Sequence, residues 1–327
     1  MDQKFYIDLL DQISDGIYFV DRDRRITYWN AGAERMTGYR AAEVLGRSCS
    51  EGFLRHVDGA GAQLCMTGCP LAAVMADGEA READVYLHHR DGQRVPVTVQ
   101  GHALRAPDGA LVGSVEVFSP RVSRCVVDRP RDDAPDPVTG LPARRFGALH
   151  LETLLRAVAE QGATLGVLFI DADHFKDVND TFGHKTGDDV LRMLGQSLAS
   201  GLRHGDVPMR WGGEEFLALL PGIDSSGLAA AAERVRMLVE NSWIQRGSRQ
   251  VRVTVSVGAT MAVAVDTVDV LVERADRLMY ASKRGGRNRA TTDSGELVSA
   301  ADRPILGTAV PWLVPEPAGP GWERAGA

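Results

Sequence analysis

The sequence has little that would mark a secreted, membrane-spanning or nucleic-acid-binding protein. Only four of its 327 residues are cysteine, which argues against a disulfide-rich secreted scaffold. No apolar run approaches the roughly 20 residues that span a bilayer, and the acidic N-terminus does not resemble a signal peptide. The net charge of -7 offers no basic excess for nucleic acid. We therefore expect a cytoplasmic protein with no membrane insertion and no nucleic-acid partner.

What is present is an ordinary globular composition, with 44% hydrophobic and 25% charged residues. This length accommodates roughly two domains. We expect an α+β fold throughout, with a sensor-sized domain over residues 1–120 and a second domain over 138–290. Residues 121–137 read as a Pro-rich linker, and 291–327 as a disordered tail rich in Ala, Gly and Pro.

The first domain shows the pattern of an antiparallel sheet. GIYFVD and RITYWN flank a polar DRDR, which predicts a hairpin, and Asn30 is placed to cap a helix. Two later Asp-Gly pairs predict further turns between strands. Arg47 to Gly78 reads as irregular. On the strand VYLHH we expect His88 at the surface and His89 in the core.

The second domain has the order β-α-β-β-α-β with extra helices, which predicts a ferredoxin-like, palm or nucleotidyl-cyclase-like core. Hydrophobic periodicity and turn signals mark its elements. The predicted helices cover 144–161, 188–202, 228–239 and 268–282, and the strands cover 164–171, 251–260 and a hairpin at 210–221.

Two acid clusters carry the functional argument. Asp171 and Asp173 follow a continuous apolar run, while Glu214 and Glu215 follow Gly212–Gly213. If the two clusters converge, they form a site for divalent cations and phosphates. Taken alone, an Asp-x-Asp is more often a helix cap or an ion pair, and a lone GGEE is a solvated hairpin tip.

RWGGEEF resembles the signature of GGDEF domains, the diguanylate cyclases. DPVTGLPARR resembles the opening motif of that family, except that Ala143 stands where asparagine is usual. DADHFKDVNDTFGHKTGDDVL resembles its nucleotide-binding segment, and MYASKRGGRNR its closing motif. The four motifs occur in the family's order between Asp136 and Arg289.

The resemblance implies that two GTP molecules condense to cyclic di-GMP and two pyrophosphates, in a homodimer and with Mg²⁺ (or Mn²⁺). It implies that Asp171, Glu214 and the Ala172 carbonyl hold the metal. Glu215 matches an acid that assists deprotonation or binds a second metal, so the catalytic set is Asp171, Glu214 and Glu215. The alternative is a catalytically weak domain that binds GTP or cyclic di-GMP as a receptor within a redox- or metal-sensing protein.

The resemblance also implies phosphate contacts from Lys176, Lys283 and Arg287. Lys283 and Arg287 are four residues apart, so we expect them on one helix face, although a cationic helix C-terminus would look the same.

The guanine base is assigned by the resemblance to Asn179 and Asp188, with Phe175 and His184 completing the substrate site. A carboxylate accepts two hydrogen bonds from the guanine edge, which adenine cannot offer. Alternatively, Asp188 is simply the N-cap of the following helix.

Arg203 and Asp206 form the RxxD string that, by resemblance, binds cyclic di-GMP as an inhibitor, with Arg234 as a secondary contact. A surface ion pair is the alternative for this short pattern.

The first domain resembles a PAS domain from about Leu10 to Ser119, which implies a sensing role. Cys49, Cys65 and Cys69 lie close in sequence, and with His56 they could form a zinc, iron–sulfur or redox site. The alternative is ordinary buried thiols. The Pro-rich linker lacks heptads, so we expect a flexible tether rather than a rigid helix between the domains.

Overall fold

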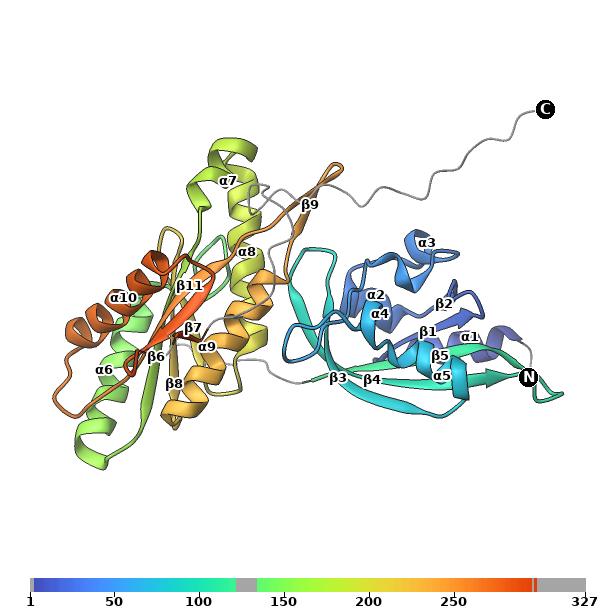
Figure 1. Ribbon diagram of the computed structural model, residues 1–327, viewed down its shortest axis with the longest axis horizontal. Coiled ribbons are helices and arrows are strands. Elements are labelled where there is room, and N and C mark those ends of the chain that lie inside the picture. The colour runs from blue at the N-terminus through green and yellow to red at the C-terminus, as the bar shows by residue number, and fades with distance from the viewer. Residues whose placement is uncertain (1–2, 122–133, 296, 299–327) are drawn as a thin grey trace.

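The computed structural model describes residues 3–121, 134–295 and 297–298. They form two units, the first built on an antiparallel sheet and the second on a ferredoxin-like sheet, as predicted (Figure 1). Most of the predicted linker and tail, at 122–133 and 299–327, lies outside the described residues. The domain boundaries therefore stay a prediction.

The first unit is a five-stranded antiparallel sheet in the order β2-β1-β5-β4-β3, with helices packed against it. The predicted β1–β2 hairpin and the strands around the Asp-Gly turns are all present. The strands are β1 (Gly16–Asp21), β2 (Ile26–Trp29), β3 (Arg81–His88), β4 (Arg94–Arg105) and β5 (Leu111–Pro120), and the helices are α1 (Gln3–Gln12), α2 (Ala31–Thr37), α3 (Ala41–Val44), η1 (Cys49–Glu51), α4 (Leu64–Thr67) and α5 (Pro70–Asp77).

Asn30 caps α2 as predicted. Its Oδ1 accepts hydrogen bonds of 2.8 Å from the backbone N–H groups of Ala33 and Ile17, so one buried amide ties the helix to β1. The expectation of an irregular segment from Arg47 to Gly78 was wrong, because η1, α4 and α5 lie within it. These helices are short, so their periodicity is weak, and Pro70 lies in the first turn of α5, where proline is tolerated.

The second unit contains a six-stranded sheet in the order β13-β12-β11-β6-β8-β7 and a separate two-stranded hairpin of β9 and β10. Its central order β11-β6-β8-β7 is the arrangement of a β-α-β-β-α-β core. The strands are β6 (Leu165–Ala172), β7 (Val207–Gly212), β8 (Glu215–Pro221), β9 (Ile244–Arg246), β10 (Arg249–Val251), β11 (Val255–Met261), β12 (Arg289–Thr292) and β13 (Leu297–Val298), and the helices are α6 (Arg144–Gln161), α7 (Phe175–Phe182), α8 (His184–Gly201), α9 (Ser225–Glu240) and α10 (Val268–Arg284).

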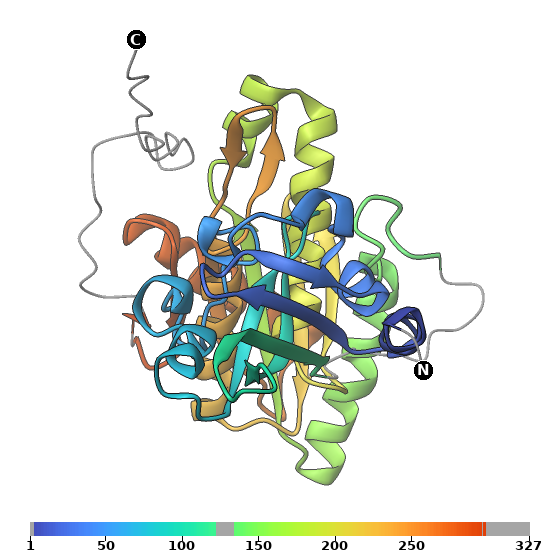
Figure 2. The same ribbon diagram turned by 90° about the vertical axis from the view of Figure 1, so that its right-hand side faces the viewer.

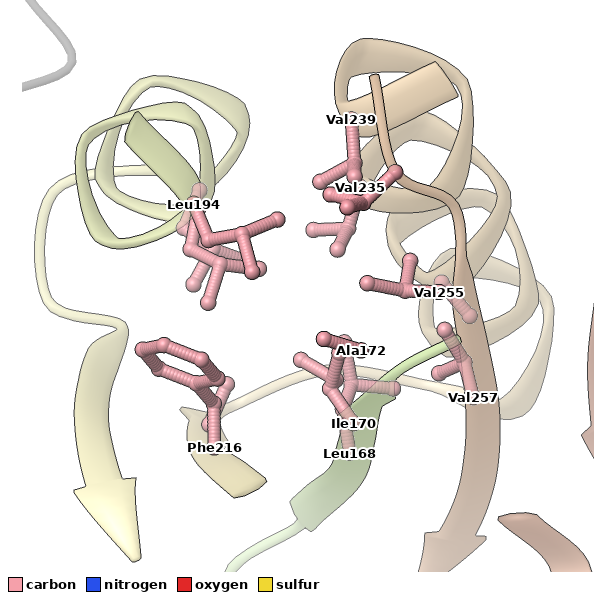
Figure 3. Packing of buried hydrophobic residues seen from close by; sticks show 14 of the residues in the cluster. Leu168, Ile170, Ala172, Leu194, Phe216, Val235, Val239, Val255 and Val257 are labelled. Atoms are coloured by element: carbon pink, nitrogen blue, oxygen red, sulfur yellow. The ribbon is translucent and has the colours of Figure 1, made fainter. Parts of the chain in front are cut away.

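Helices cover both faces of this sheet, and strand alternation decides which face each residue meets. Leu168, Ile170 and Ala172 of β6 pack with Phe216 against α8 and α9 (Figure 3). Val167, Phe169, Leu217 and Leu219 belong to the core on the α6 and α10 side. The alternation therefore places Asp171 on the α10 face of the sheet.

Three predicted boundaries in this unit were wrong. The helix predicted from 188 begins at His184, and α7 before it was missed because Gly183 allows a sharp corner between two short amphipathic helices. The strand predicted over 251–260 is interrupted at 252–254, and its first residue, Val251, belongs to the β9–β10 hairpin, which stands beside α8 in Figure 2. Residues 291–292 and 297–298, predicted within the tail, pair with the sheet as parts of β12 and β13.

None of the described helices combines the length and apolar character needed to cross a membrane.

Candidate functional site

The two acid clusters meet where β6 ends. Asp171 pairs with Glu215 across the β6–β8 ladder, so their side chains leave the same face of the sheet. Glu214 precedes β8 in the turn, and its carbonyl accepts a hydrogen bond from the Ala172 N–H at 3.3 Å. Asp171, Ala172 and Glu214 line one open cleft of about 200 Å³. The sequence-based prediction that these acids converge is borne out by this arrangement.

The β7–β8 turn differs in detail from the prediction. Gly212 pairs with Glu215, so the two-residue turn is Gly213–Glu214, and Glu214 is itself in the turn. A methyl group added at Gly213 would meet no protein atom within 4 Å, which leaves open space beside the turn.

Sequence reasoning missed the clamp that holds this turn. Arg210 donates two hydrogen bonds, of 3.0 and 2.7 Å, to the Gly213 carbonyl and binds the Asp136 carboxylate at 3.0 Å. Burial pushes the pKa of Asp136 upward, but hydrogen bonds from Thr139 and Arg210 outweigh it, and the net pKa lies below the usual value. The opening motif and the hairpin, 74 residues apart, are thus joined by one ion pair.

A lysine neutralises the buried acid. Lys283 Nζ lies 2.8 Å from Asp171 Oδ1, and Asp171 is only 5% exposed. Burial raises the pKa of Asp171, and Lys283 opposes that rise. Burial, and then the charge of Asp171, also raise the pKa values of Glu214 and Glu215. The cleft therefore concentrates negative charge and attracts a cation.

Arg287 lines the same cleft but not for the predicted reason. Helix α10 ends at Arg284, and Arg287 and Asn288 both have left-handed backbone, with φ of 64° and 47°. The expectation that Lys283 and Arg287 share a helix face was wrong. A strained turn after the helix, rather than helical spacing, brings the second cation to the cleft.

Asp173, the second acid of the first cluster, is a structural residue. It is 3% exposed and accepts hydrogen bonds from Thr254 Oγ1 at 2.6 Å, Ser256 Oγ at 2.7 Å and the Asn288 N–H at 3.0 Å. It therefore fixes the closing motif against β11. No local signal separates its role from that of Asp171, because its partners are more than 80 residues away.

The predicted nucleotide residues divide into two groups. Lys176 lines the cleft at the exposed side of α7, and Phe175 lines it from the core. Asn179, His184 and Asp188 do not line it. Asn179 instead lies over Gly187 at the junction of α7 and α8, one residue from the exposed Asp188. The N-cap alternative for Asp188 was wrong, since the cap position of α8 is Gly183.

The donor set suits a divalent cation. Two carboxylates and a backbone carbonyl, from Asp171, Glu214 and Ala172, are the hard oxygen ligands that Mg²⁺ prefers. In the described part of the chain, no three His, Cys, Asp or Glu side chains are arranged to hold a metal ion. A cation at this cleft would therefore need backbone and substrate oxygens to complete its shell, as Mg²⁺ commonly does with phosphates.

Comparison with known proteins gives the family. The family model "Diguanylate cyclase, GGDEF domain" matches residues 134–289, and the model "PAS fold" matches residues 10–123. The chain is a PAS–GGDEF protein. The GGDEF match begins with the segment of Asp136 and ends at Arg289, so it contains the whole cleft.

Similar proteins include "Diguanylate cyclase A" of Treponema denticola, 39% identical over 46% of this chain and 41% of the relative. "Probable diguanylate cyclase DgcE" of Escherichia coli is 33% identical over 86% of this chain and 25% of the relative. The crystal structure of the GGDEF domain of DgcB from Caulobacter crescentus in complex with c-di-GMP is 35% identical over 50% of this chain and 98% of that chain, with a TM-score of 0.48. The PAS–GGDEF chain thus spans less than half the length of these two curated relatives.

The RxxD string of the GGDEF domain forms an internal pair. Asp206 is 1% exposed and bonds to the backbone N–H and Nε of Arg203, while Arg203 Nη2 donates to the Pro221 carbonyl at 2.6 Å. Arg234 donates to the Gly201 carbonyl on the neighbouring helix end. The Arg203 side chain is half exposed, so it is the member that a ligand could reach.

The three cysteines of the PAS domain line a closed internal cavity together with His56 and Glu116, but it has room for only about 10 Å³ of solvent. Burial raises the pKa of Cys49 strongly and that of Cys65 to about 11, so both stay thiols at neutral pH. Among the described residues no three metal-ligating side chains are arranged to hold an ion, and the metal or redox role of the three cysteines stays a prediction. His88 was expected at the surface but is 2% exposed, because its ring is covered by the GGDEF domain.

Proposed function

We propose that this PAS–GGDEF protein is a diguanylate cyclase, which condenses two GTP molecules into cyclic di-GMP and releases two pyrophosphates. The observation that carries the proposal is the cleft that Asp171 and Glu214 line together with Lys283 and Arg287, while Glu215 pairs with Asp171 across the β6–β8 ladder. Carboxylates for a cation and cations for phosphates are what a nucleotidyl transfer needs at one place.

Each residue has a distinct task in this proposal. Asp171, Glu214 and the Ala172 carbonyl would hold Mg²⁺ or Mn²⁺, which when bound neutralises the triphosphate and lowers the pKa of the attacking 3′-hydroxyl. Lys283, Arg287 and Lys176 bind phosphate oxygens. Lys283 would exchange its bond to Asp171 for one to phosphate.

Glu215 lies beside Asp171 on the same face, where its raised pKa suits it to accept the hydroxyl proton. Asn179 and Asp188 would bind the guanine edge from the α7–α8 junction, with His184 nearby.

The proposal includes two domains facing each other, because one cleft holds one GTP. It also includes inhibition by cyclic di-GMP at Arg203, Asp206 and Arg234, which requires Asp206 to give up part of its bonding to Arg203. The PAS domain would regulate the reaction, and we place the protein in the cytoplasm, where GTP is available.

The experiment is to incubate the full chain with GTP and Mg²⁺ and to measure cyclic di-GMP by liquid chromatography and mass spectrometry. Formation of cyclic di-GMP, lost in Glu215→Gln, supports the cyclase. Tight GTP binding without any product would instead favour the receptor function. The control is Glu160→Gln, which removes an exposed acid of α6. It changes the net charge of the protein by the same amount as Glu215→Gln does.

A further inference from the structure

The two domains enclose a second, larger cleft of about 970 Å³. The PAS domain contributes the segment around Arg55 and the β3–β4 turn, and the GGDEF domain contributes α8 and the β9–β10 hairpin. The walls are joined directly, since the Trp243 N–H donates to the Gly92 carbonyl at 3.2 Å and the Trp243 carbonyl bonds His88 Nε2 at 3.1 Å. The cleft is therefore part of the domain contact.

Three arginines surround Trp243 at this contact. The guanidinium carbons of Arg55, Arg94 and Arg252 lie 4.9, 5.3 and 4.8 Å from the centroid of the indole ring, and the His88 ring stacks on it at 3.4 Å. Within the described ranges, none of these three arginines forms an ion pair with a carboxylate. Cation–π contacts offset only part of the cost of gathering like charges.

The cost of placing these positive charges together appears in the lowered pKa values of Arg94 and Arg252. Burial, followed by the charges of Arg252 and Arg55, lowers the pKa of Arg94 to about 9. Burial and the charge of Arg55 lower the pKa of Arg252 to about 10. Arg55 is held with left-handed backbone, at a φ of 35°, which is unfavourable for a side chain of this size. The fold therefore keeps a positive cluster here against both charge repulsion and backbone strain.

The cleft has a positive charge excess contributed by both domains. Five arginines and three carboxylates line it, and Glu43, outside the lining, pairs with one of these arginines, Arg90, at 3.0 Å, which leaves one positive charge uncompensated. On the PAS side, Arg55 has no carboxylate partner among the described residues. On the GGDEF side, Arg192 and Arg246 share the single carboxylate of Asp189. An anion in the cleft could accept hydrogen bonds from both walls at once.

We propose that this interdomain cleft binds a phosphate-bearing anion, which Arg55 of the PAS domain and Arg246 of the GGDEF domain contact together. Guanidinium forks suit phosphate oxygens, and the positive charge excess of the cleft favours an anion. The bound anion bridges the two domains and holds them in the arrangement of Figure 1. The proposal does not depend on the cyclase reaction.

The test is isothermal titration calorimetry of the full chain with inorganic phosphate and, separately, with GMP. We expect saturable binding that weakens about tenfold in both Arg55→Gln and Arg246→Gln. Arg156→Gln, which removes an exposed arginine on α6, should bind as the unaltered chain does. Arg287→Gln removes a cation from the other cleft, so it identifies phosphate that binds there instead.

The outcomes are distinct. Tighter binding of GMP than of phosphate, with the same dependence on Arg55, identifies a nucleotide ligand; equal binding identifies the phosphate group alone. Loss of binding in Arg287→Gln but not in Arg55→Gln overturns the proposal, as does no saturable binding. Hydrogen exchange gives a second readout, because the anion should slow exchange at residues 88–92 and 241–246 together. Binding without that protection would overturn the bridging role.

Discussion

The cleft beside Asp171 and the cavity beside Glu116 bury carboxylates in opposite ways. Lys283, 2.8 Å away, opposes the rise that burial causes in the pKa of Asp171, and the cleft is open. Glu116 is 2% exposed, and its nearest cationic candidate, His56, is 3.8 Å away and equally buried. Burial raises the pKa of Glu116 to about 7 and lowers that of His56 to about 4. The GGDEF cleft is thus built for charge, whereas the PAS cavity favours neutral groups.

Asp171→Asn should separate function from stability in the open cleft. We expect the rate of cyclic di-GMP formation to fall about a thousandfold. Mutation of a residue that only hydrogen-bonds to a metal ligand typically costs about ten- to hundredfold in activity, and loss of a ligand itself should cost more. The free energy of unfolding should change by less than about 1 kcal/mol, since Lys283 is partly exposed and can be hydrated. Product assays and urea denaturation measure the two effects. Activity within tenfold of the unaltered chain would contradict the assignment.

Asp173→Ala, two residues further along the chain, should lower the stability of the protein strongly, unlike Asp171→Asn. Its carboxylate serves three donors, and removing it leaves the hydroxyls of Thr254 and Ser256 and the Asn288 N–H unpaired. We expect a loss of about 3 kcal/mol in the free energy of unfolding, measured in urea. An equal stability for the Asp171→Asn and Asp173→Ala variants would show that the three hydrogen bonds of Asp173 contribute no more to stability than the ion pair of Asp171 does.

Glu116 and His56, which line the PAS cavity, should contribute to stability with opposite pH dependence. The folded pKa of Glu116 lies above its ordinary 4.5, so its contribution to stability is complete below pH 4.5 and is lost as pH rises through about 7. The folded pKa of His56 lies below its ordinary 6.5, so its contribution is complete above pH 6.5 and is lost as pH falls through about 4. Between pH 4.5 and 6.5 the two slopes cancel.

Each variant removes one of these slopes. From pH 4.5 to 6.5 the stability of His56→Gln should fall by roughly 2 kcal/mol, and that of Glu116→Gln should rise by a similar amount. Denaturation in urea at several pH values measures this. Parallel pH profiles for the two variants would mean that the pair is charged in the folded protein, as in the open cleft.

Gly213→Ala should have the smallest effect on stability. The added methyl group meets no protein atom within 4 Å, and Gly213 does not need a positive φ, so we expect less than about 0.5 kcal/mol. If that space receives phosphates, the KM for GTP rises severalfold. An unchanged KM would place the phosphates elsewhere in the cleft. Gly187→Ala is the contrasting variant, because its methyl would collide with Asn179 Oδ1.

The sequence by itself determined most of the longer elements and pointed to the converging acids, whereas the short helices η1, α4, α5 and α7 were missed. Apolar periodicity placed α6 at its observed bounds, and the alternation of β6 with the hairpin around Glu215 was enough to bring the carboxylates to one face. These features depend on local spacing, which the chain carries in any context.

Tertiary structure alone decided which charges are paired. Arg210 reaches Asp136, Asp173 reaches Asn288 and Trp243 reaches His88 across many tens of residues. The same folding closed the PAS cavity around Glu116 and opened the cleft around Asp171. The reason is physical: the cost of a buried charge depends on its neighbours in space and on access to water, and neither is encoded in the residues adjacent to it in sequence.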